Sequence, residues 1–580
     1  MVTPSEVRPL NNTQIAEILL GMAMAVEFLE DNPFKVKAYR KAAQSISALE
    51  VPVEELIDTG EIDRVKGVGQ AIGAHLKAWV KGHDFSALEE LRARIPPGLA
   101  EMGKVQGLGI KKLRTLHREL GIATLDDLLA AIDQGRLSGV KGFPDKSIGK
   151  LRGSIETVLQ YRGWYLLDAA WAWGREMIEL LKESGLKAEV TGACRRAMEV
   201  VQSVDLLVEG AGDEEEKVRQ CLTAVPGVKV GREGDALVGT HPDKPPVKVL
   251  TVPAPVFLPA LFITTGSDVH VARARKIGAE RAVSIGFDGV KKDSRDVPVR
   301  DETEIYGLLG MPYLPPEVRE GRDLEFGRTM GDILPRLISL EDLVGTIHIH
   351  TTFSDGKSSL EDMARAAQRR GFAWIGISDH SRSAYYAGGL IEPDLMKQLA
   401  EIDRLNAALG GITLLKGIES DILADGALDY PPEILSRLDF VIASVHSHMD
   451  MDAASMTERI IRAIRNPYTS ILGHVTGRVL LSRQPYELDL EKVLLEAARC
   501  RVAVELNANP QRLDIDWRLI EGFVSLGGRV IIGPDAHAAG GLDDVIYGVA
   551  LARKGLLTKD ACLNTLQADR LKEVFASRWK

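Results

Sequence analysis

The 580-residue sequence predicts a multidomain protein with a helical N-terminal region, an α+β middle and a C-terminal α/β barrel. Three observations predict this. The chain is longer than one hydrophobic core usually supports, and its 45% hydrophobic residues suffice for several cores. Gly-x-Gly turns recur between helical stretches before residue 160. After residue 340, apolar strand-like runs alternate with helical stretches.

The C-terminal barrel is predicted from its histidines. Seven of the twelve histidines lie between His348 and His537, interleaved with carboxylates, and each polar piece follows an apolar run. This order of strand, polar side chain and helix predicts a βα barrel whose polar side chains meet at the C-terminal ends of the strands. The expected strands are 346–350, 372–378, 414–418, 440–445, 471–473, 502–506 and 529–532, with helices at 359–370 and 491–499.

Imidazoles and carboxylates together are the ligands of catalytic divalent metal ions. Their spread over many short pieces argues against a compact structural zinc module, which holds its ligands at close spacing. Scattered surface or core histidines are the alternative interpretation. The position of so many histidines at strand ends favours a metal site.

The N-terminal region contains a repeated hairpin pattern. Val65–Gly73 and Val105–Leu113 both have the hGhG form of a helix-hairpin-helix, and Val140–Pro144 is a weaker third copy. Such a turn exposes backbone N–H groups at a helix N-terminus, where they bind DNA phosphates without reading the bases. A plain interhelical turn is the alternative for a single copy. The expected DNA-binding residues are Gly67, Gly69, Gly107, Gly109, Lys111 and Lys112.

Composition limits the partners and the compartment. The net charge of −10 argues against a generic nucleic-acid binder, but residues 1–160 are balanced, with 21 basic and 21 acidic side chains. No apolar run reaches the ~18 residues of a membrane span, so no membrane partner is expected. Four cysteines without a CxxC pattern fit a reducing compartment. We therefore expect a cytoplasmic, nucleoid-associated protein.

The C-terminal motifs HIHTTFSDG, ISDH, GIE, SVHSH, GHVTGR and GPDAHA resemble those of the PHP (polymerase and histidinol phosphatase) domain, over about 335–575. The resemblance implies up to three Mn²⁺ or Zn²⁺ ions that hydrolyse phosphate esters. It implies a bridging role for Glu419, and we take Glu419 and Asp535 as catalytic. We assign Asp379 to orienting a ligand imidazole and His448 to contacting substrate. The implied ligands are His348, His350, Asp355, His380, Glu419, His446, His474, Asp535 and His537.

Residues 1–330 resemble the family X, or polymerase-β-like, DNA polymerases. The resemblance is carried by Asn32–Arg40, by the thumb-like Leu309–Gly321, and by the Gly192–Arg196 and Thr265–Ser267 turns. It implies that the incoming dNTP contacts Arg195, Arg196, Gly266 and Ser267. The chain as a whole resembles the bacterial PolX family. The implied divisions are a helical DNA-binding domain at 1–92, fingers-like helices at 93–164, palm at 165–255, thumb at 256–325, linker at 326–339 and PHP domain at 340–580.

The polymerase half departs from its family at the metal ligands. Of three expected aspartates only Asp205 is present, because Ser203 and Lys248 occupy the other positions. A protonated lysine cannot bind a metal ion. We favour severe impairment of the polymerase activity. The alternative that stays open is weak activity with Mg²⁺ or Mn²⁺, held by catalytic Asp205 and a substitute ligand such as Glu199 or Glu209. Three further positions depart from the family. Ala193 stands where a triphosphate-binding Ser is expected, and Ile263-Thr264 stands where a pair of aromatic residues is expected. His75 stands where the family has the lysine nucleophile of its lyase activity, and Lys35, Lys37, Lys77 or Lys81 could substitute for that lysine.

We therefore predict a monomeric DNA repair enzyme of the PolX type. Its barrel acts as a metal-dependent 3′–5′ exonuclease, and its N-terminal half holds DNA that is gapped, primed or has a free 3′ end, with dNTPs as further ligands. A non-catalytic DNA-binding scaffold and a small-molecule phosphatase of the histidinol-phosphatase type are the alternatives.

Overall fold

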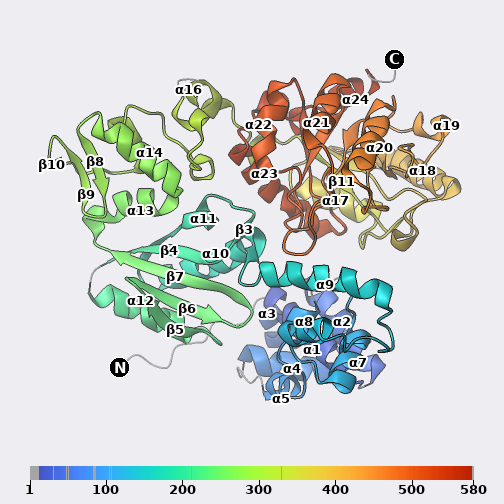
Figure 1. Cartoon of the computed structure of the whole chain (residues 1–580), viewed down its shortest axis with the longest axis horizontal. Helices are drawn as coiled ribbons and strands as arrows, with labels where there is room; N and C mark the ends of the chain where they lie inside the picture. Colours follow the sequence, from blue (N-terminus) through green and yellow to red (C-terminus); the bar gives the residue numbers. More distant parts are fainter. Residues whose placement is uncertain are drawn as a thin grey trace. The chain divides into compact units, whose positions relative to one another are not determined.

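The computed structural model describes residues 12–577 except 31, 48, 50, 82–85, 104, 106, 211, 328 and 329. The chain divides into two compact units (Figure 1). The first reaches residue 162 and takes in 481–483, and the second contains 163–480 and 484 onwards. None of the helices within the described ranges has both the length and the apolar character needed to cross a membrane.

The first unit is helical and has two large hydrophobic cores and a small third one around Val26. One large core contains Leu19, Ile46 and Trp79, and the other large core contains Leu116 and Ile155. The described helices are α1 (Asn12–Phe28), α2 (Pro33–Ser47), α3 (Val53–Asp58), α4 (Gln70–Lys81), α5 (Ser86–Arg92), α6 (Leu99–Met102), α7 (Ile110–Leu120), α8 (Leu125–Asp133) and α9 (Asp145–Gln160).

The second unit begins with a five-stranded sheet in the order β2-β4-β7-β6-β5. Strands β4 and β7 run parallel, while the other neighbours are antiparallel. Helices α10 and α12 share one core with this sheet, and α13 packs against Leu207 from another core. The elements are β1 (Tyr165–Leu166), α10 (Leu167–Glu183), β2 (Lys187–Thr191), α11 (Gly192–Arg195), β3 (Val200–Val201), β4 (Val204–Glu209), α12 (Asp213–Ala224), β5 (Lys229–Glu233), β6 (Ala236–His241), β7 (Lys244–Val252) and α13 (Phe257–Thr265).

A thumb-like region follows, with its own core around Phe262, Tyr306 and Leu309. At its centre Arg319 is fully buried and forms an ion pair with Glu302. Its elements are α14 (Asp268–Ala279), β8 (Val283–Gly286), β9 (Gly289–Lys292), β10 (Arg295–Asp296) and α15 (Glu302–Leu308). The predicted linker forms the short helix α16 (Met330–Ile333) and then buries Leu337 and Ile338.

The C-terminal region is a nearly closed parallel barrel of seven strands in sequence order. The first and last strands approach each other, because the Thr346 hydroxyl donates to the Ile532 carbonyl at 3.0 Å. Every predicted strand is present, with bounds that differ by a few residues. The strands are β11 (Gly345–Ile349), β12 (Trp374–Ile377), β13 (Thr413–Asp421), β14 (Phe440–Ser444), β15 (Ile471–Leu472), β16 (Ala503–Asn507) and β17 (Val530–Gly533).

Helices lie outside the strands, and the last helix closes one end of the barrel. Strand residues Ile347, Phe440 and Ile531 share a buried core with Leu571 and Phe575 of α24. The ligand candidates are left at the strands' C-terminal ends. The helices are α17 (Leu360–Arg369), α18 (Glu392–Ala408), α19 (Pro432–Leu435), α20 (Ala453–Arg465), α21 (Leu490–Arg499), α22 (Trp517–Ser525), α23 (Val545–Lys554) and α24 (Ala568–Ala576).

Candidate metal centre and polymerase site

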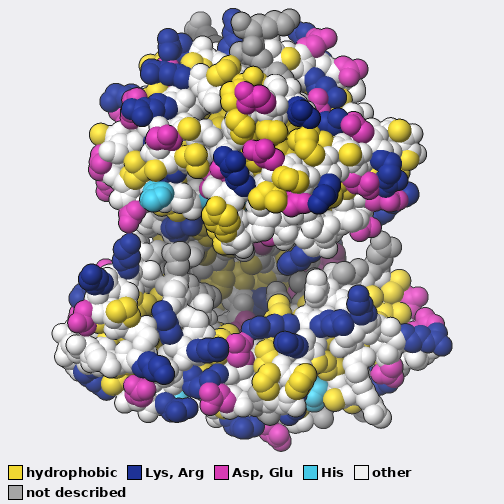
Figure 2. All heavy atoms as spheres, turned by 90° about the vertical axis from the view of Figure 1, so that its right-hand side faces the viewer, with side chains coloured by type: hydrophobic (Ala, Val, Ile, Leu, Met, Phe, Trp, Pro, Cys, Tyr) yellow, Lys and Arg dark blue, Asp and Glu magenta, His cyan; other side chains and the backbone are white. Residues whose placement is uncertain are grey.

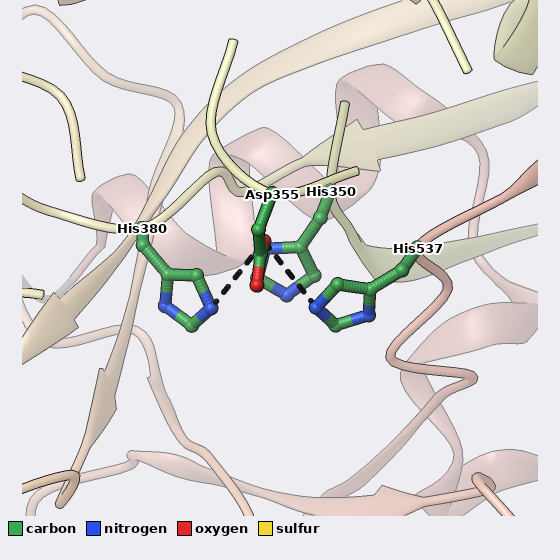
Figure 3. Close-up of side chains that lie close together, drawn as sticks. All are labelled: His350, Asp355, His380 and His537. Atoms are coloured by element: carbon green, nitrogen blue, oxygen red, sulfur yellow. Dashed lines mark ion pairs between the residues drawn. The ribbon is translucent and has the colours of Figure 1, made fainter. Parts of the chain in front are cut away.

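The barrel brings together all nine side chains that the sequence nominated as metal ligands. They form four overlapping groups in which ligand atoms lie within 4.8 Å of one another. Figure 3 shows the members of one group turned towards each other around Asp355. The groups are His350, Asp355, His380 and His537; His348, Glu419 and His474; His348, His350 and Asp535; and His380, Glu419 and His446.

Glu419 lies at the centre of this arrangement. One carboxylate oxygen is 2.9 Å from His474 Nε2 and 3.2 Å from His446 Nε2. The other is 2.9 Å from His380 Nδ1 and 3.7 Å from His350 Nε2. The residue is 1% exposed and lies within β13, which continues two residues beyond it. A carboxylate whose two oxygens face different sets of imidazoles has the geometry of a bridging ligand.

Unpartnered buried atoms show that the centre fits metal ions. Among the described residues, His348 Nε2, both ring nitrogens of His350 and Glu419 Oε2 are buried without a hydrogen-bond partner. Leaving such atoms unpaired costs about 1–3 kcal/mol each. All four atoms belong to candidate ligands, and each of these ligands is a member of at least two of the four groups. Divalent cations held between them would satisfy these atoms.

Opposite charges hold the two central carboxylates ionised. Although burial opposes it, His446, His348 and His380 lower the pKa of Glu419 well below its ordinary value. Burial also opposes the lowering at Asp535, whose pKa falls well below the ordinary range because of His348, His350 and Arg512. Both side chains are therefore present as carboxylates, the form that binds a cation.

The backbone is strained at three of these positions. His348, Asp535 and His474 adopt positive φ angles of 62°, 54° and 20°. Residues other than glycine rarely adopt this region, and holding one there costs on the order of 1–3 kcal/mol. The surrounding barrel imposes the strain at the points where β11, β15 and β17 end. Backbone strain at strand ends is frequent at functional sites.

A second layer of side chains, which the sequence did not single out, orients the ligands. Glu505 in β16 is fully buried and contacts Nδ1 of His348. Asp421 Oδ1 lies 2.6 Å from His446 Nδ1. Asp535 accepts a bond from Asn507 at 3.1 Å and lies 3.2 Å from Arg512. The sequence signal that could have identified Glu505 is a glutamate inside the otherwise apolar run 502–506.

The role predicted for Asp379 was wrong. Its carboxylate contacts the loop after His350 instead of a ligand imidazole. It accepts bonds from the Thr351 backbone N–H at 2.8 Å, the Thr351 hydroxyl at 2.7 Å and the Ser354 backbone N–H at 3.1 Å. Asp379 thus holds the loop that presents Asp355. His448, the predicted substrate contact, is exposed and belongs to none of the ligand groups.

The polymerase site has the departures that the sequence indicated. Asp205 on β4 is in register with Lys248 on β7, and Lys248 forms an ion pair of 2.8 Å with Glu233. The Ser203 hydroxyl donates to Asp205 at 2.7 Å. Burial raises the pKa of Asp205. A cation therefore stands where a third carboxylate is expected.

Neither substitute proposed for the missing palm ligands joins Asp205 in a ligand group. Glu199 lies 3.0 Å from Arg518 of the barrel, and Glu209 lies 2.5 Å from Lys187. Throughout the described ranges, the groups of three or more His, Cys, Asp and Glu close enough to hold an ion all lie in the barrel.

The residues predicted to bind a nucleotide make bonds inside the chain. Arg195 donates to the Thr265 hydroxyl at 2.7 Å and to Glu302 at 2.8 Å. Arg196 donates to Glu320 at 2.9 Å, and Glu320 also pairs with the buried Lys554 of α23. The other two members of this set, Gly266 and Ser267, lie at the α13–α14 turn, where the Ser267 hydroxyl accepts from the His270 backbone N–H at 3.1 Å. A bound triphosphate would compete with these contacts.

Three turns of the first unit share one geometry. Gly67, Gly107 and Gly142 have φ angles of 92°, 82° and 94°, and a long helix begins three residues after each glycine. Gly109 and Pro144 are the N-caps of α7 and α9, where no side chain of the described residues caps the helix. Pro144 therefore preserves the turn in the third copy. Lys112 donates to the Gly107 carbonyl at 2.9 Å, and Lys111 lies beside it in the first turn of α7.

His75 occupies the position at which the family has its lyase lysine, as the sequence indicated. His75 stacks on Trp79 with ring centroids 5.7 Å apart, and burial lowers its pKa. Of the possible substitutes, Lys77 pairs with Asp63 at 3.1 Å, while the side chain of Lys81 lies outside the described residues. None of these contacts singles out a lysine nucleophile.

The fold and the centre define a class: a PHP-type barrel with a candidate metal centre, joined to a polymerase-type palm and thumb and to helix-hairpin-helix turns. Family models agree with this class. They match a helix-hairpin-helix domain at residues 10–85, a DNA polymerase beta thumb at 260–320 and a PHP domain at 346–509. These domains imply DNA binding and dependence on divalent metal ions.

Whole-chain similarity gives the family. The sequence is 34% identical over 578 residues to the DNA polymerase/3′-5′ exonuclease PolX of Bacillus subtilis (strain 168), covering 98% of this chain and 99% of that one. The chain therefore belongs to the PolX family. Probable phosphatases of Thermoanaerobacter sp. (strain X514) and Caldanaerobacter subterraneus are 30% and 29% identical, over 38% and 41% of this chain and 91% and 93% of their own.

Proposed function

We propose that the barrel is a 3′–5′ exonuclease that removes nucleotides from DNA by metal-dependent hydrolysis. The observation that carries this proposal is the complete set of nine side chains around Glu419, in the same chain as the hairpin turns. We assign the metal-holding role to all nine and the catalytic role to Glu419 and Asp535. The second-layer residues Glu505 and Asp421 orient the imidazoles, as outer-shell carboxylates do at other metal sites.

Up to three ions, Mn²⁺ or Zn²⁺, would be held by the four overlapping groups. Bound there, they would supply hydroxide at neutral pH and offset charge on the phosphate oxygens. The protein's part is to keep Glu419 and Asp535 ionised and to fix the imidazole orientations. Mixed nitrogen and oxygen ligands accept both metals.

The first unit supports this substrate assignment. We assign the phosphate contacts to Gly67, Gly69, Gly107 and Gly109, aided by Lys111 and Lys112, because their backbone geometry suits a phosphate at a helix N-terminus. Figure 2 shows many Lys and Arg side chains on the face of this unit, in the lower part of the view. The DNA held would be gapped, primed or carry a free 3′ end, as in gap or base-excision repair. We assign the protein to the cytoplasm, in association with the nucleoid. We also assign it a monomeric state.

Nucleotide addition is the weaker activity in this proposal. Asp205 faces Lys248, and Arg195 and Arg196 are engaged with Glu302 and Glu320. A site with this charge pattern binds Mg²⁺ or Mn²⁺ poorly and meets competition for a dNTP triphosphate. Residual extension would depend on Asp205.

A phosphatase acting on small molecules is the second candidate, because relatives named as probable phosphatases match 38% and 41% of this chain over most of their own length. A comparison of turnover on histidinol phosphate and on a 5′-labelled DNA primer, both with Mn²⁺, separates the two. The exonuclease proposal predicts shortening of the primer and loss of that activity in Glu419→Ala. Intact DNA beside rapid release of phosphate would overturn it. A protein that binds DNA and turns over neither compound would be a non-catalytic scaffold.

A further inference from the structure

Two exposed tyrosines lie beside the metal centre. Tyr385 is 86% exposed, the most of any large hydrophobic side chain of the described residues, and Tyr386 is 73% exposed, third after Phe34. They form the short 3-10 turn Tyr385–Ala387, five residues after the candidate ligand His380. Exposing aromatic area to water is unfavourable, by about 25 cal/mol per Å². A pair held in the open next to a metal centre therefore calls for a functional explanation.

The turn that carries them is fixed in place. The residues before and after the pair, Ala384 and Ala387, are buried at 0% and 3% exposure. Gly388 follows with φ of 66°, and a Cβ on Gly389 would lie 1.9 Å from the Ser381 carbonyl oxygen. The backbone is therefore closely packed on both sides of the two exposed tyrosines.

Hydrogen bonds tie the same turn to the metal centre. The Leu390 backbone N–H donates to the His380 carbonyl at 2.8 Å, and the Ser381 N–H donates to the Glu419 carbonyl at 3.0 Å. On the other side, the Ser383 N–H donates to Asp429 at 2.7 Å. The position of the turn relative to two candidate ligands is therefore set by the backbone itself.

Tyr386 is the member of the pair that faces the centre. Its ring centroid lies 6.2 Å from that of His380, with the planes tilted by 57°. Desolvation of its hydroxyl and then the carboxylates of Asp421, Glu419 and Asp355 raise its pKa above the ordinary value of a tyrosine. Most of the residue nevertheless remains open to solvent.

We infer that Tyr386 is a stacking platform for the nucleobase of the 3′-terminal nucleotide. This rests on the proposed exonuclease function. The base and the phosphate of one nucleotide are joined by a single sugar, so a base belonging to a phosphate at the centre must lie immediately beside it. An aromatic ring in that place stacks on any base, which suits removal of nucleotides regardless of sequence. A small phosphate ester without a base would gain nothing from it.

The expected size of the effect follows from base stacking. Alanine substitution of a stacking aromatic costs about 1–3 kcal/mol per base, which corresponds to roughly 5- to 150-fold. Tyr386→Ala should therefore raise KM for single-stranded DNA within that range and change kcat less. Tyr386→Phe keeps the ring and should stay within about twofold of wild type, since stacking does not need the hydroxyl.

The decisive experiment compares two oligonucleotides that differ only at the 3′ end, one with a normal terminal nucleotide and one with an abasic terminal nucleotide. Wild type, Tyr386→Ala, Tyr386→Phe and Leu526→Ala would be assayed with Mn²⁺. Leu526 is 52% exposed just after α22 and controls for loss of exposed apolar surface. The inference predicts a large KM effect of Tyr386→Ala on the normal end and almost none on the abasic end.

Three results would overturn the inference. One is an equal loss on both ends, which would assign Tyr386 to the backbone or to the fold. Another is a loss in Tyr386→Phe as large as in Tyr386→Ala, which would assign the effect to the hydroxyl. The third is wild-type KM in Tyr386→Ala. Wild-type protein that leaves both oligonucleotides intact would instead contradict the proposed function, so the two failures are distinguishable.

Discussion

Replacement of Glu505 by glutamine tests whether the second layer controls the metal centre. One carboxylate oxygen of Glu505 contacts His348 Nδ1, and the other accepts the His474 backbone N–H at 2.7 Å. The Glu505 side chain fits at this position because Gly533 beside it has no side chain. A Cβ on Gly533 would lie 2.7 Å from Glu505 Oε1. One buried carboxylate thus positions two candidate ligands on different strands.

The magnitude follows from the hydrogen-bond inventory. The His474 N–H is always a donor, and His348 Nδ1 is a donor whenever its Nε2 binds a metal ion. A carboxylate accepts from both, whereas the glutamine amide has only one oxygen and must turn its NH₂ towards one donor. Leaving that donor unsatisfied costs about 1–3 kcal/mol. Second-layer substitutions elsewhere lower metal affinity or activity about 10- to 100-fold, which is the loss expected for Glu505→Gln.

The assay is a calorimetric Mn²⁺ titration together with the exonuclease rate as a function of Mn²⁺ concentration. Glu521→Gln, an exposed change on α22, is the matched control. We expect weaker Mn²⁺ binding and a higher Mn²⁺ requirement in Glu505→Gln alone. If Glu505→Gln bound Mn²⁺ and cut DNA as wild type does, the account of the second layer would be refuted.

Three further predictions concern other parts of the molecule. Burial and the neighbours Asp168 and Asp543 raise the pKa of Asp544 to about 7, so its stabilising contribution is complete below its ordinary pKa of 3.8 and is lost as pH rises through 7. Asp544→Asn should therefore raise the melting temperature more at pH 8 than at pH 5, and an equal change at both would contradict this. Gly107→Ala places a side chain at φ of 82° and should weaken DNA binding and destabilise its turn by about 1–2 kcal/mol, measured by fluorescence anisotropy and thermal melting. Gly149→Ala, in the middle of α9 with open space around it, should bind DNA as wild type does and be neutral or slightly stabilising. Ser203→Asp with Lys248→Asp would place three carboxylates together, one just before β4, one on β4 and one on β7, and should create Mn²⁺ binding in a barrel-deficient Asp535→Asn background; an unchanged titration there would show that more than the ligands is missing.

The barrel could be predicted from sequence because its strands are strongly apolar and each ends in a polar residue. Runs such as Phe440–Ser444 are buried on both faces, so their composition alone identifies them. Most candidate ligands end such a run or lie within a few residues of its end, while Asp355 lies in the loop that follows the first strand, and parallel strands place those ends at one edge. The position of Lys248 opposite Asp205 followed from strand spacing in the same way.

Other features depend on contacts between distant segments and were not predictable. Glu505 lies inside the predicted strand 502–506, and its role depends on a contact with His348, which is more than 150 residues away in the sequence. Asp379 precedes a ligand in sequence, which suggested an imidazole partner, yet the fold turns its carboxylate towards Thr351. The engagement of Arg196 by Glu320, and of Glu320 by Lys554, joins three segments of the chain.

We propose that the barrel, and not the palm, is the working catalytic centre. The most direct measurement follows a 5′-labelled DNA strand with Mn²⁺ in wild type, Asp535→Asn and Asp205→Ala. We predict that Asp535→Asn abolishes shortening of the strand while Asp205→Ala shortens it at the wild-type rate. Undiminished degradation by Asp535→Asn, or its loss in Asp205→Ala, would contradict the account.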